Sequence, residues 1–135
     1  MQAVRLALML LFLGFCCVPV GAQQVPSFNR DIRPILSDRC FACHGPDSAK
    51  READLRLDDR AAAIAGGAIV PGNPDDSAII QRVLSTDADT VMPPPHAKLG
   101  TLSAGEVNLL REWIRGVSPA ALSGSGGSWS DGAGE

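Results

Sequence analysis

Apolar positions along the first part of the chain recur at the spacing of one helix face. This face runs directly into a pair of cysteines and is made of Phe28, Ile32, Ile35 and Leu36. Pro34 is tolerated only in a first helical turn, so we expect the helix to start near Asp31, with Asp31 or Asn29 as its cap. The pattern predicts a short amphipathic helix that leads into Cys40 and Cys43.

Two further short helices are marked by capping residues. Residues 60–65 are expected to form one, capped by Asp58 or Asp59 and stopped by Gly66 and Gly67. The run Asn73-Pro74-Asp75-Asp76 predicts the start of another, with a capping Asn, a proline in the first turn and two acids on the helix dipole. That helix is expected to turn four residues inward: Ala78, Ile79, Val83 and Leu84.

The last helix has the best-marked beginning. Ser103 and Glu106 have capping-box spacing, and Leu102 with Val107 has the spacing of a hydrophobic staple. Gly116 supplies the expected stop. The buried stripe is expected to contain Val107, Leu110, Trp113 and Ile114.

Between the helices lie turns rich in proline and glycine, and the only extended piece expected is a short one at 68–70. The fold class is therefore all-α, a small domain of a few short helices with long loops. Only 4% of the 135 residues are aromatic. With rings expected only from Phe28, Phe41 and Trp113, the core looks too thin to stand alone.

The two ends of the chain differ from the middle in composition. Arg5, an apolar run at 6–15 and the small residues at 20–22 predict a signal peptide over 1–22 and export to the periplasm; a retained N-terminal membrane anchor is the alternative. Residues 117–135 are rich in Gly, Ser and Ala with an isolated Trp129, which predicts a flexible tail or linker. The folded domain is placed at 23–116, with no membrane span after cleavage.

The formal net charge is -3, which excludes a basic field for nucleic acid. Two of the four cysteines and two of the three methionines lie in the predicted leader. The sulfurs of the mature chain are therefore those of Cys40, Cys43 and Met92, and each is a candidate for chemistry.

The run Cys40-Phe41-Ala42-Cys43-His44 has the pattern of covalent haem attachment. Two thiols three positions apart on a helical turn can each add to a haem vinyl group, and His44 is then placed as an axial ligand of the iron. A disulfide would leave His44 unexplained, a thioredoxin-like pair needs a βαβ setting, and a structural zinc lacks ligands. The pattern favours one covalent haem c, whose ring would also supply the missing core.

Met92 is the candidate for the sixth ligand of the iron. It precedes three prolines, which make an extended and stiff loop. A thioether is a soft ligand that raises the reduction potential of haem iron. His96, in the same loop, is the rival ligand, although an exposed loop histidine is the simpler interpretation.

The remaining polar residues carry weaker signals. Residues 50–52 and 58–60 are expected to be solvated surface, and Arg56 and Arg82 are candidates for contact with haem propionates. The turn at Gly45-Pro46 is expected to free a nearby carbonyl that orients His44.

Several segments in order resemble the planctomycete-type cytochrome c domain: FNRDIRPILSDRCFACHGPD, LRLDDR, IVPGNPDDSAIIQRV, VMPPP and LSAGEVNLLREWIRG, together spanning about 27–116. The resemblance implies a class I-like cytochrome c fold, haem on Cys40 and Cys43, and His44 and Met92 as axial ligands. The sequence departs from the family pattern in two places. Ala53-Asp54 replaces a small, glycine-rich pair, and the turn at 66–68 is shorter than usual.

The sequence predicts an exported electron carrier rather than an enzyme, because no catalytic set of side chains is evident. One alternative is a haem redox module that serves a fused or docked periplasmic enzyme, for which the tail is the evidence. A peroxidase-like haem enzyme with an open sixth site, using His96, is the other. The acidic charge favours a redox partner protein with a basic docking face.

Overall fold

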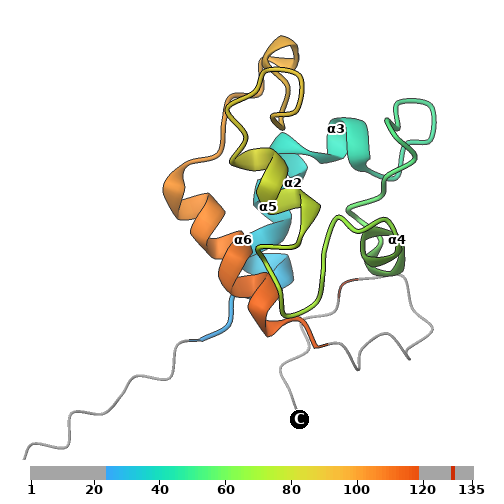
Figure 1. Ribbon diagram of the computed structural model, residues 1–135. Helices are drawn as coiled ribbons and strands as arrows, with labels where there is room; N and C mark the ends of the chain where they lie inside the picture. Colours follow the sequence, from blue (N-terminus) through green and yellow to red (C-terminus); the bar gives the residue numbers. More distant parts are fainter. Residues whose placement is uncertain (1–23, 119–128, 130–135) are drawn as a thin grey trace, which may run out of the picture.

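The computed structural model describes residues 24–118 and Trp129, and these residues form an all-α domain (Figure 1). An isolated bridge at Asp59 is the only strand-like residue described between 24 and 118. Six of the seven helical elements have seven residues or fewer, and long turns connect them. In chain order they are η1 (Phe28–Ile32), α2 (Arg33–Arg39), α3 (Phe41–His44), α4 (Arg60–Ala65), α5 (Ala78–Val83), η2 (Pro95–Ala97) and α6 (Ala104–Gly116).

The first helix begins at Phe28, earlier than the sequence pattern predicted. It opens as a π-helical turn, η1, and continues without a break as α2. Ser27, not Asp31 or Asn29, is the cap: its Oγ accepts from the Arg30 N–H, and the Asp31 carboxylate accepts from the Ser27 N–H at 2.8 Å. Pro34 is the second residue of α2 and lies six residues after Phe28, so the expectation that Pro34 marks the start of the helix is wrong.

Helix α4 has the predicted bounds and the predicted cap. The Asp59 carboxylate accepts from the Ala62 N–H at 2.9 Å. Gly66 is the C-cap of the helix, and Gly67 follows with a φ of +69°, a left-handed conformation that favours glycine. Both residues of the predicted stop are therefore used.

Helix α5 begins at Ala78, several residues later than predicted. Asn73 does not cap it, because residues 74–76 form a turn. The reason is Ser77, whose buried hydroxyl donates to the Asn73 carbonyl at 2.8 Å and accepts from the Val70 N–H at 2.9 Å. The inward face also differs: Ile79 and Ile80 are buried, whereas Leu84 is 55% exposed.

Helix α6 confirms the predicted capping box and the predicted buried stripe. Ser103 Oγ accepts from the Glu106 N–H, and the Glu106 carboxylate accepts from the Ser103 N–H. Gly116 is the last helical residue and not a left-handed stop. A Cβ on Gly116 would lie 2.3 Å from a methyl group of Val25, so glycine lets the N-terminal segment pass close to the helix.

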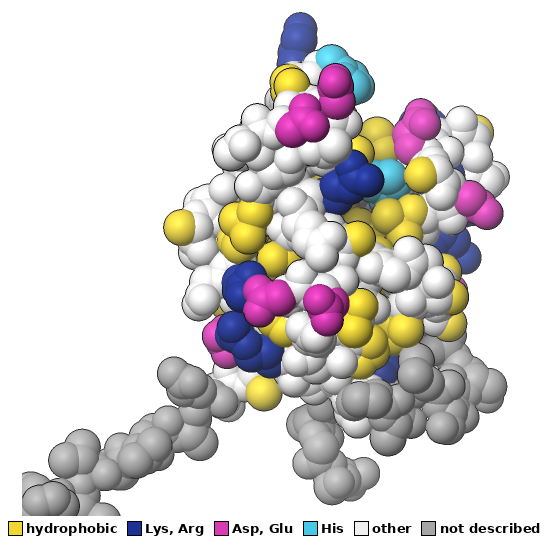
Figure 2. Space-filling model, in the orientation of Figure 1, with side chains coloured by type: hydrophobic (Ala, Val, Ile, Leu, Met, Phe, Trp, Pro, Cys, Tyr) yellow, Lys and Arg dark blue, Asp and Glu magenta, His cyan; other side chains and the backbone are white. Residues whose placement is uncertain are grey.

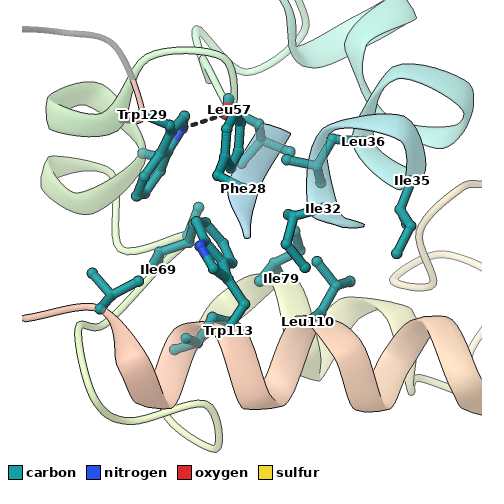
Figure 3. Packing of buried hydrophobic residues seen from close by; sticks show 14 of the residues in the cluster. Phe28, Ile32, Ile35, Leu36, Leu57, Ile69, Ile79, Leu110, Trp113 and Trp129 are labelled. Atoms are coloured by element: carbon teal, nitrogen blue, oxygen red, sulfur yellow. Dashed lines mark hydrogen bonds between the residues drawn. The ribbon is translucent and has the colours of Figure 1, made fainter. Parts of the chain in front are cut away.

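The hydrophobic core lies between η1, α2, α5 and α6, and an aromatic cluster closes one side of it (Figure 3). The ring centroids are 5.5 Å apart for Phe28 and Trp113, 5.4 Å for Phe28 and Trp129, and 4.7 Å for Trp113 and Trp129. Trp129 is only 5% exposed. The expectation that Trp129 stands apart from the folded unit is therefore wrong, and Phe41, the third ring expected in the core, is only half-buried.

Other expectations about the ends of the chain stay predictions. The proposed leader, residues 1–22, and most of the proposed tail lie outside the described residues. Within the described part of the chain, the helices are all too short or too polar to span a bilayer.

Candidate haem-binding site

Cys43 and His44 lie on α3, a single helical turn that follows α2, and Cys40 is the N-cap of that turn. The amides of Cys43 and His44 both donate to the Cys40 carbonyl, at 3.1 and 2.8 Å. Cys40, Cys43 and His44 are half-buried, and neither thiol is bonded to a partner. The local fold thus brings three of the four predicted ligands onto one turn.

The Cys40 thiol does not have the properties of a reactive redox cysteine. Burial raises the pKa of this thiol to about 12, although the Arg39 guanidinium opposes the shift. A thioredoxin-like or thiolate-based site needs the opposite shift, because the thiolate is the reactive form. The neutral state of Cys40 disfavours the redox-pair alternative and is compatible with a thiol that adds to a carbon–carbon double bond.

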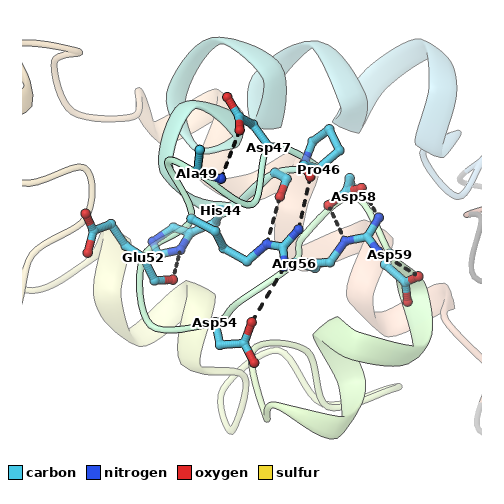
Figure 4. Close-up of polar contacts among 11 residues, drawn as sticks. His44, Pro46, Asp47, Ala49, Glu52, Asp54, Arg56, Asp58 and Asp59 are labelled. Carbon is cyan, nitrogen blue, oxygen red and sulfur yellow. Dashed lines mark hydrogen bonds and ion pairs between the residues drawn. The ribbon is translucent and has the colours of Figure 1, made fainter.

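The His44 ring is oriented by a backbone carbonyl (Figure 4). Its Nδ1 lies 3.2 Å from the Glu52 carbonyl oxygen. Because a carbonyl can only accept, Nδ1 carries the proton, and the Nε2 lone pair is left for a metal. The sequence predicted such a carbonyl near Gly45-Pro46, and the structure assigns the role to Glu52.

Two backbone features bring Glu52 back to the histidine. At Gly45, a Cβ would lie 2.4 Å from the Phe41 carbonyl oxygen, so only glycine allows this close approach. Ala53 and Asp54 have φ values of +53° and +50°, the left-handed region. In the family that the sequence resembles, a small, glycine-rich pair stands at these two positions. The chain therefore differs from the family at positions where the backbone conformation favours glycine.

The loop is also tied to α3 by its own amides. Glu52 N–H donates to the Cys43 carbonyl at 2.7 Å, and Leu57 N–H donates to the His44 carbonyl at 2.8 Å. The carbonyls of Cys43 and His44 are therefore both bound by amides of the segment 52–57.

Arg51 is a site residue that the sequence did not reveal. We expected it in solvated surface, but its side chain is only 17% exposed. The guanidinium donates to the carbonyls of Gly45 and Pro46, the two residues directly after His44. A charged run in sequence gave no sign of these contacts, because they depend on the fold of the loop.

The two arginines proposed for haem propionates already have partners in the protein. Arg56 pairs with Asp58 at 2.6 Å and Asp59 at 3.8 Å, and the hydrogen bond that the guanidinium donates to Asp58 raises the pKa of the guanidinium. Arg82 is exposed and donates to the Thr90 carbonyl at 3.3 Å. Their contact with a propionate stays a prediction.

Met92 lies in the loop between α5 and η2. It is half-buried, and its N–H donates to the Arg82 carbonyl at 3.0 Å, which holds the loop to the end of α5. His96 is exposed within η2. Figure 1 shows this loop and α3 at the same end of the molecule. Ligation by Met92 rather than His96 stays a prediction.

The residues present fit a covalent haem. Two unbonded thiols and an oriented imidazole share one turn, and Cys40, Phe41 and Leu55 are partly exposed apolar residues that pack against the core. Figure 2 shows apolar side chains gathered in the hollow between the two upper lobes of the molecule. Among the described residues, no group of three or more His, Cys, Asp or Glu side chains is arranged to hold a metal ion.

Part of the chain matches a known protein family. Residues 40–96 match the family model described as Planctomycete cytochrome C. The match begins at Cys40 and ends at His96, so it includes the cysteine pair, His44 and Met92. No curated protein and no solved structure matches the chain.

Proposed function

We propose that the protein, whose residues 40–96 match the planctomycete cytochrome C family model, is an exported c-type cytochrome. It transfers single electrons through one haem, attached covalently to Cys40 and Cys43, with His44 and Met92 as axial ligands. It acts as a carrier between redox partners and not as an enzyme.

The observation that carries the proposal is the α3 turn. Each thiol would add its sulfur and its hydrogen across one vinyl group of the haem. The S–H bond and the π bond of the vinyl group would break, and a carbon–sulfur and a carbon–hydrogen bond would form. A neutral Cys40 thiol retains the hydrogen that this addition needs. Bound haem supplies a one-electron couple, and the chain determines how that couple is held.

His44 and Met92 have different tasks in the proposal. Donation from Nδ1–H to the Glu52 carbonyl fixes the ring orientation and makes the imidazole a better donor. The Met92 thioether would favour the reduced iron of a bound haem and would so raise its reduction potential. With both side chains bound to the iron, no position would be left for a substrate, which suits a carrier.

The first experiment is an absorption spectrum of protein matured in a periplasm, in oxidised and reduced form. We expect a low-spin c-type spectrum. The pigment should stay with the protein during extraction with acid and organic solvent, because the haem is covalently bound. Cys40→Ala with Cys43→Ala should release the pigment. A colourless wild-type protein from a host that matures other c-type cytochromes would refute the proposal.

The axial ligand is tested by a matched pair of variants. Met92→Ala should abolish the charge-transfer band between thioether and iron, and His96→Ala should retain it. The reverse result assigns the ligand to His96. Rapid, stoichiometric binding of carbon monoxide by the reduced wild type at neutral pH would instead favour the peroxidase-like alternative with an open sixth site.

Export and partner choice are parts of the same proposal. The N-terminal sequence of the matured protein should begin at Gln23, and a mature chain that starts at Met1 would indicate a retained anchor. Transfer to a basic partner protein should slow as ionic strength rises. The alternative role as a redox module would be supported if the gene continued into an enzyme domain.

A further inference from the structure

The side chain of Arg51 bridges the two ends of the loop that begins after the histidine ligand. Its Nε donates to the Gly45 carbonyl at 3.2 Å, and its Nη2 donates to the Pro46 carbonyl at 3.0 Å. The third nitrogen, Nη1, lies 3.6 Å from the Asp54 carboxylate. Every nitrogen of the guanidinium thus faces a residue of the same loop.

The two ends of the loop that Arg51 joins are the residues that lie next to His44. Gly45 follows His44 directly, and Glu52, whose carbonyl faces the ring, follows Arg51 directly. The contact between residue 51 and the carbonyls at 45 and 46 therefore acts together with the Glu52 N–H bond to the Cys43 carbonyl in holding Glu52 near the imidazole (Figure 4).

Arginine suits this task better than lysine. A planar guanidinium presents donors in a fixed fork, so it can hold two adjacent carbonyls at once, whereas an ammonium is a single point on a flexible stem. The neighbouring Lys50 shows the contrast. Its side chain is 75% exposed and makes only an ion pair of 3.6 Å with Asp47, which is half exposed.

We infer that Arg51 is the positioning residue of the proximal ligand. By closing the loop from 45 to 54, it keeps the Glu52 carbonyl on Nδ1 of His44 and so determines how strongly the imidazole donates to a bound haem iron. The inference rests on the proposed function, because it concerns the electronic state of an iron ligand.

Arg51→Lys separates positioning from charge. The variant keeps the positive charge but loses the fork, so the loop opens more often and the bond from Nδ1–H to Glu52 is broken for more of the time. A weaker bond makes the imidazole a poorer donor, which destabilises the oxidised iron. We therefore expect the reduction potential to rise.

The direct measurement is hydrogen exchange of the His44 ring proton in the reduced, haem-loaded protein, followed by NMR. We expect exchange at least tenfold faster in Arg51→Lys than in wild type. In a redox titration against a fixed reference couple, the equilibrium constant should shift about threefold toward the reduced protein. This shift corresponds to a reduction potential about 28 mV higher, because a tenfold change equals about 59 mV for one electron.

The matched control is Lys50→Arg, which makes the reverse exchange one position earlier. It should leave the exchange rate within twofold and the potential unchanged. Arg51→Lys with wild-type exchange and potential would overturn the inference. A wild-type protein without a c-type spectrum would instead refute the proposed function.

If Arg51→Lys is not matured, Arg51→Gln provides a second test. Its side chain is shorter and carries a single nitrogen, so it cannot reproduce the separate contacts of Nε and Nη2 with the two carbonyls, and ring-proton exchange should again accelerate at least tenfold. Unchanged exchange in this variant also overturns the inference.

Discussion

Replacing Trp129 by alanine tests the part of the core that the sequence pattern missed. The indole is 5% exposed and packs against both Phe28 and Trp113. Its Nε1 donates to the Leu57 carbonyl at 3.0 Å, and the Arg60 guanidinium lies 5.8 Å from the centre of the ring. Trp129→Ala removes all of these contacts at once.

The expected loss follows from the contacts. Truncating a buried tryptophan to alanine costs about 3–5 kcal/mol of the free energy of unfolding, because apolar burial is lost and a cavity is left. The hydrogen bond to Leu57 accounts for about 1 kcal/mol of this. Trp129→Phe keeps a ring and loses the bond, so it should cost about 1–2 kcal/mol.

The assay is equilibrium unfolding of the haem-loaded protein in guanidinium chloride, followed by far-ultraviolet circular dichroism. Leu109→Ala is the control, because Leu109 on α6 is 38% exposed and its truncation should cost less than about 1 kcal/mol. If Trp129→Ala is within about 0.5 kcal/mol of wild type, Trp129 does not stabilise the core and belongs to a flexible tail, as its neighbours' composition suggested.

Three smaller perturbations test local features by thermal or chemical unfolding. Gly45→Ala places a Cβ 2.4 Å from the Phe41 carbonyl oxygen and should cost about 1–3 kcal/mol; wild-type stability would contradict the required close approach. Ala53→Gly relieves a φ of +53° and should stabilise by about 0.5–1 kcal/mol, whereas a lower melting temperature would argue against the left-handed turn. Hydrogen bonds from Ser103 lower the pKa of Glu106 from its ordinary 4.5. The wild type should therefore have a larger free energy of unfolding than Glu106→Gln above pH 4.5, and this difference should shrink as the pH falls below 4.5. An equal difference at pH 7 and pH 3 would refute this assignment.

Features encoded by neighbouring residues could be predicted from the sequence. The capping box of α6 needs only Ser103 and Glu106, three positions apart, and the structure has it. The buried face of η1 and α2 followed from the 3.6-residue period alone. The grouping of Cys40, Cys43 and His44 on one turn likewise follows from their spacing.

Features that depend on contacts across a loop could not be predicted. The start of α5 was wrong because the Ser77 hydroxyl bonds to the backbone at Asn73 and Val70 and holds a turn where a helix was expected. Arg51 looked like part of a solvated charged run until the loop placed two carbonyls around it. In both cases a side chain satisfies backbone groups that no periodicity or composition identifies.

The aromatic cluster and the histidine turn meet at one residue, Leu57. Its N–H donates to the His44 carbonyl at 2.8 Å, and its carbonyl accepts from Trp129 at 3.0 Å. Its side chain is 3% exposed within the core. The segment after the 45–54 loop is therefore bound on one side to His44 and on the other side to Trp129 in the core. Because these bonds belong to adjacent backbone groups, loosening Trp129 should also loosen the support of His44. Comparing the haem spectrum of Trp129→Phe with that of Trp129→Ala separates this effect from loss of the core, since only the alanine variant removes the ring.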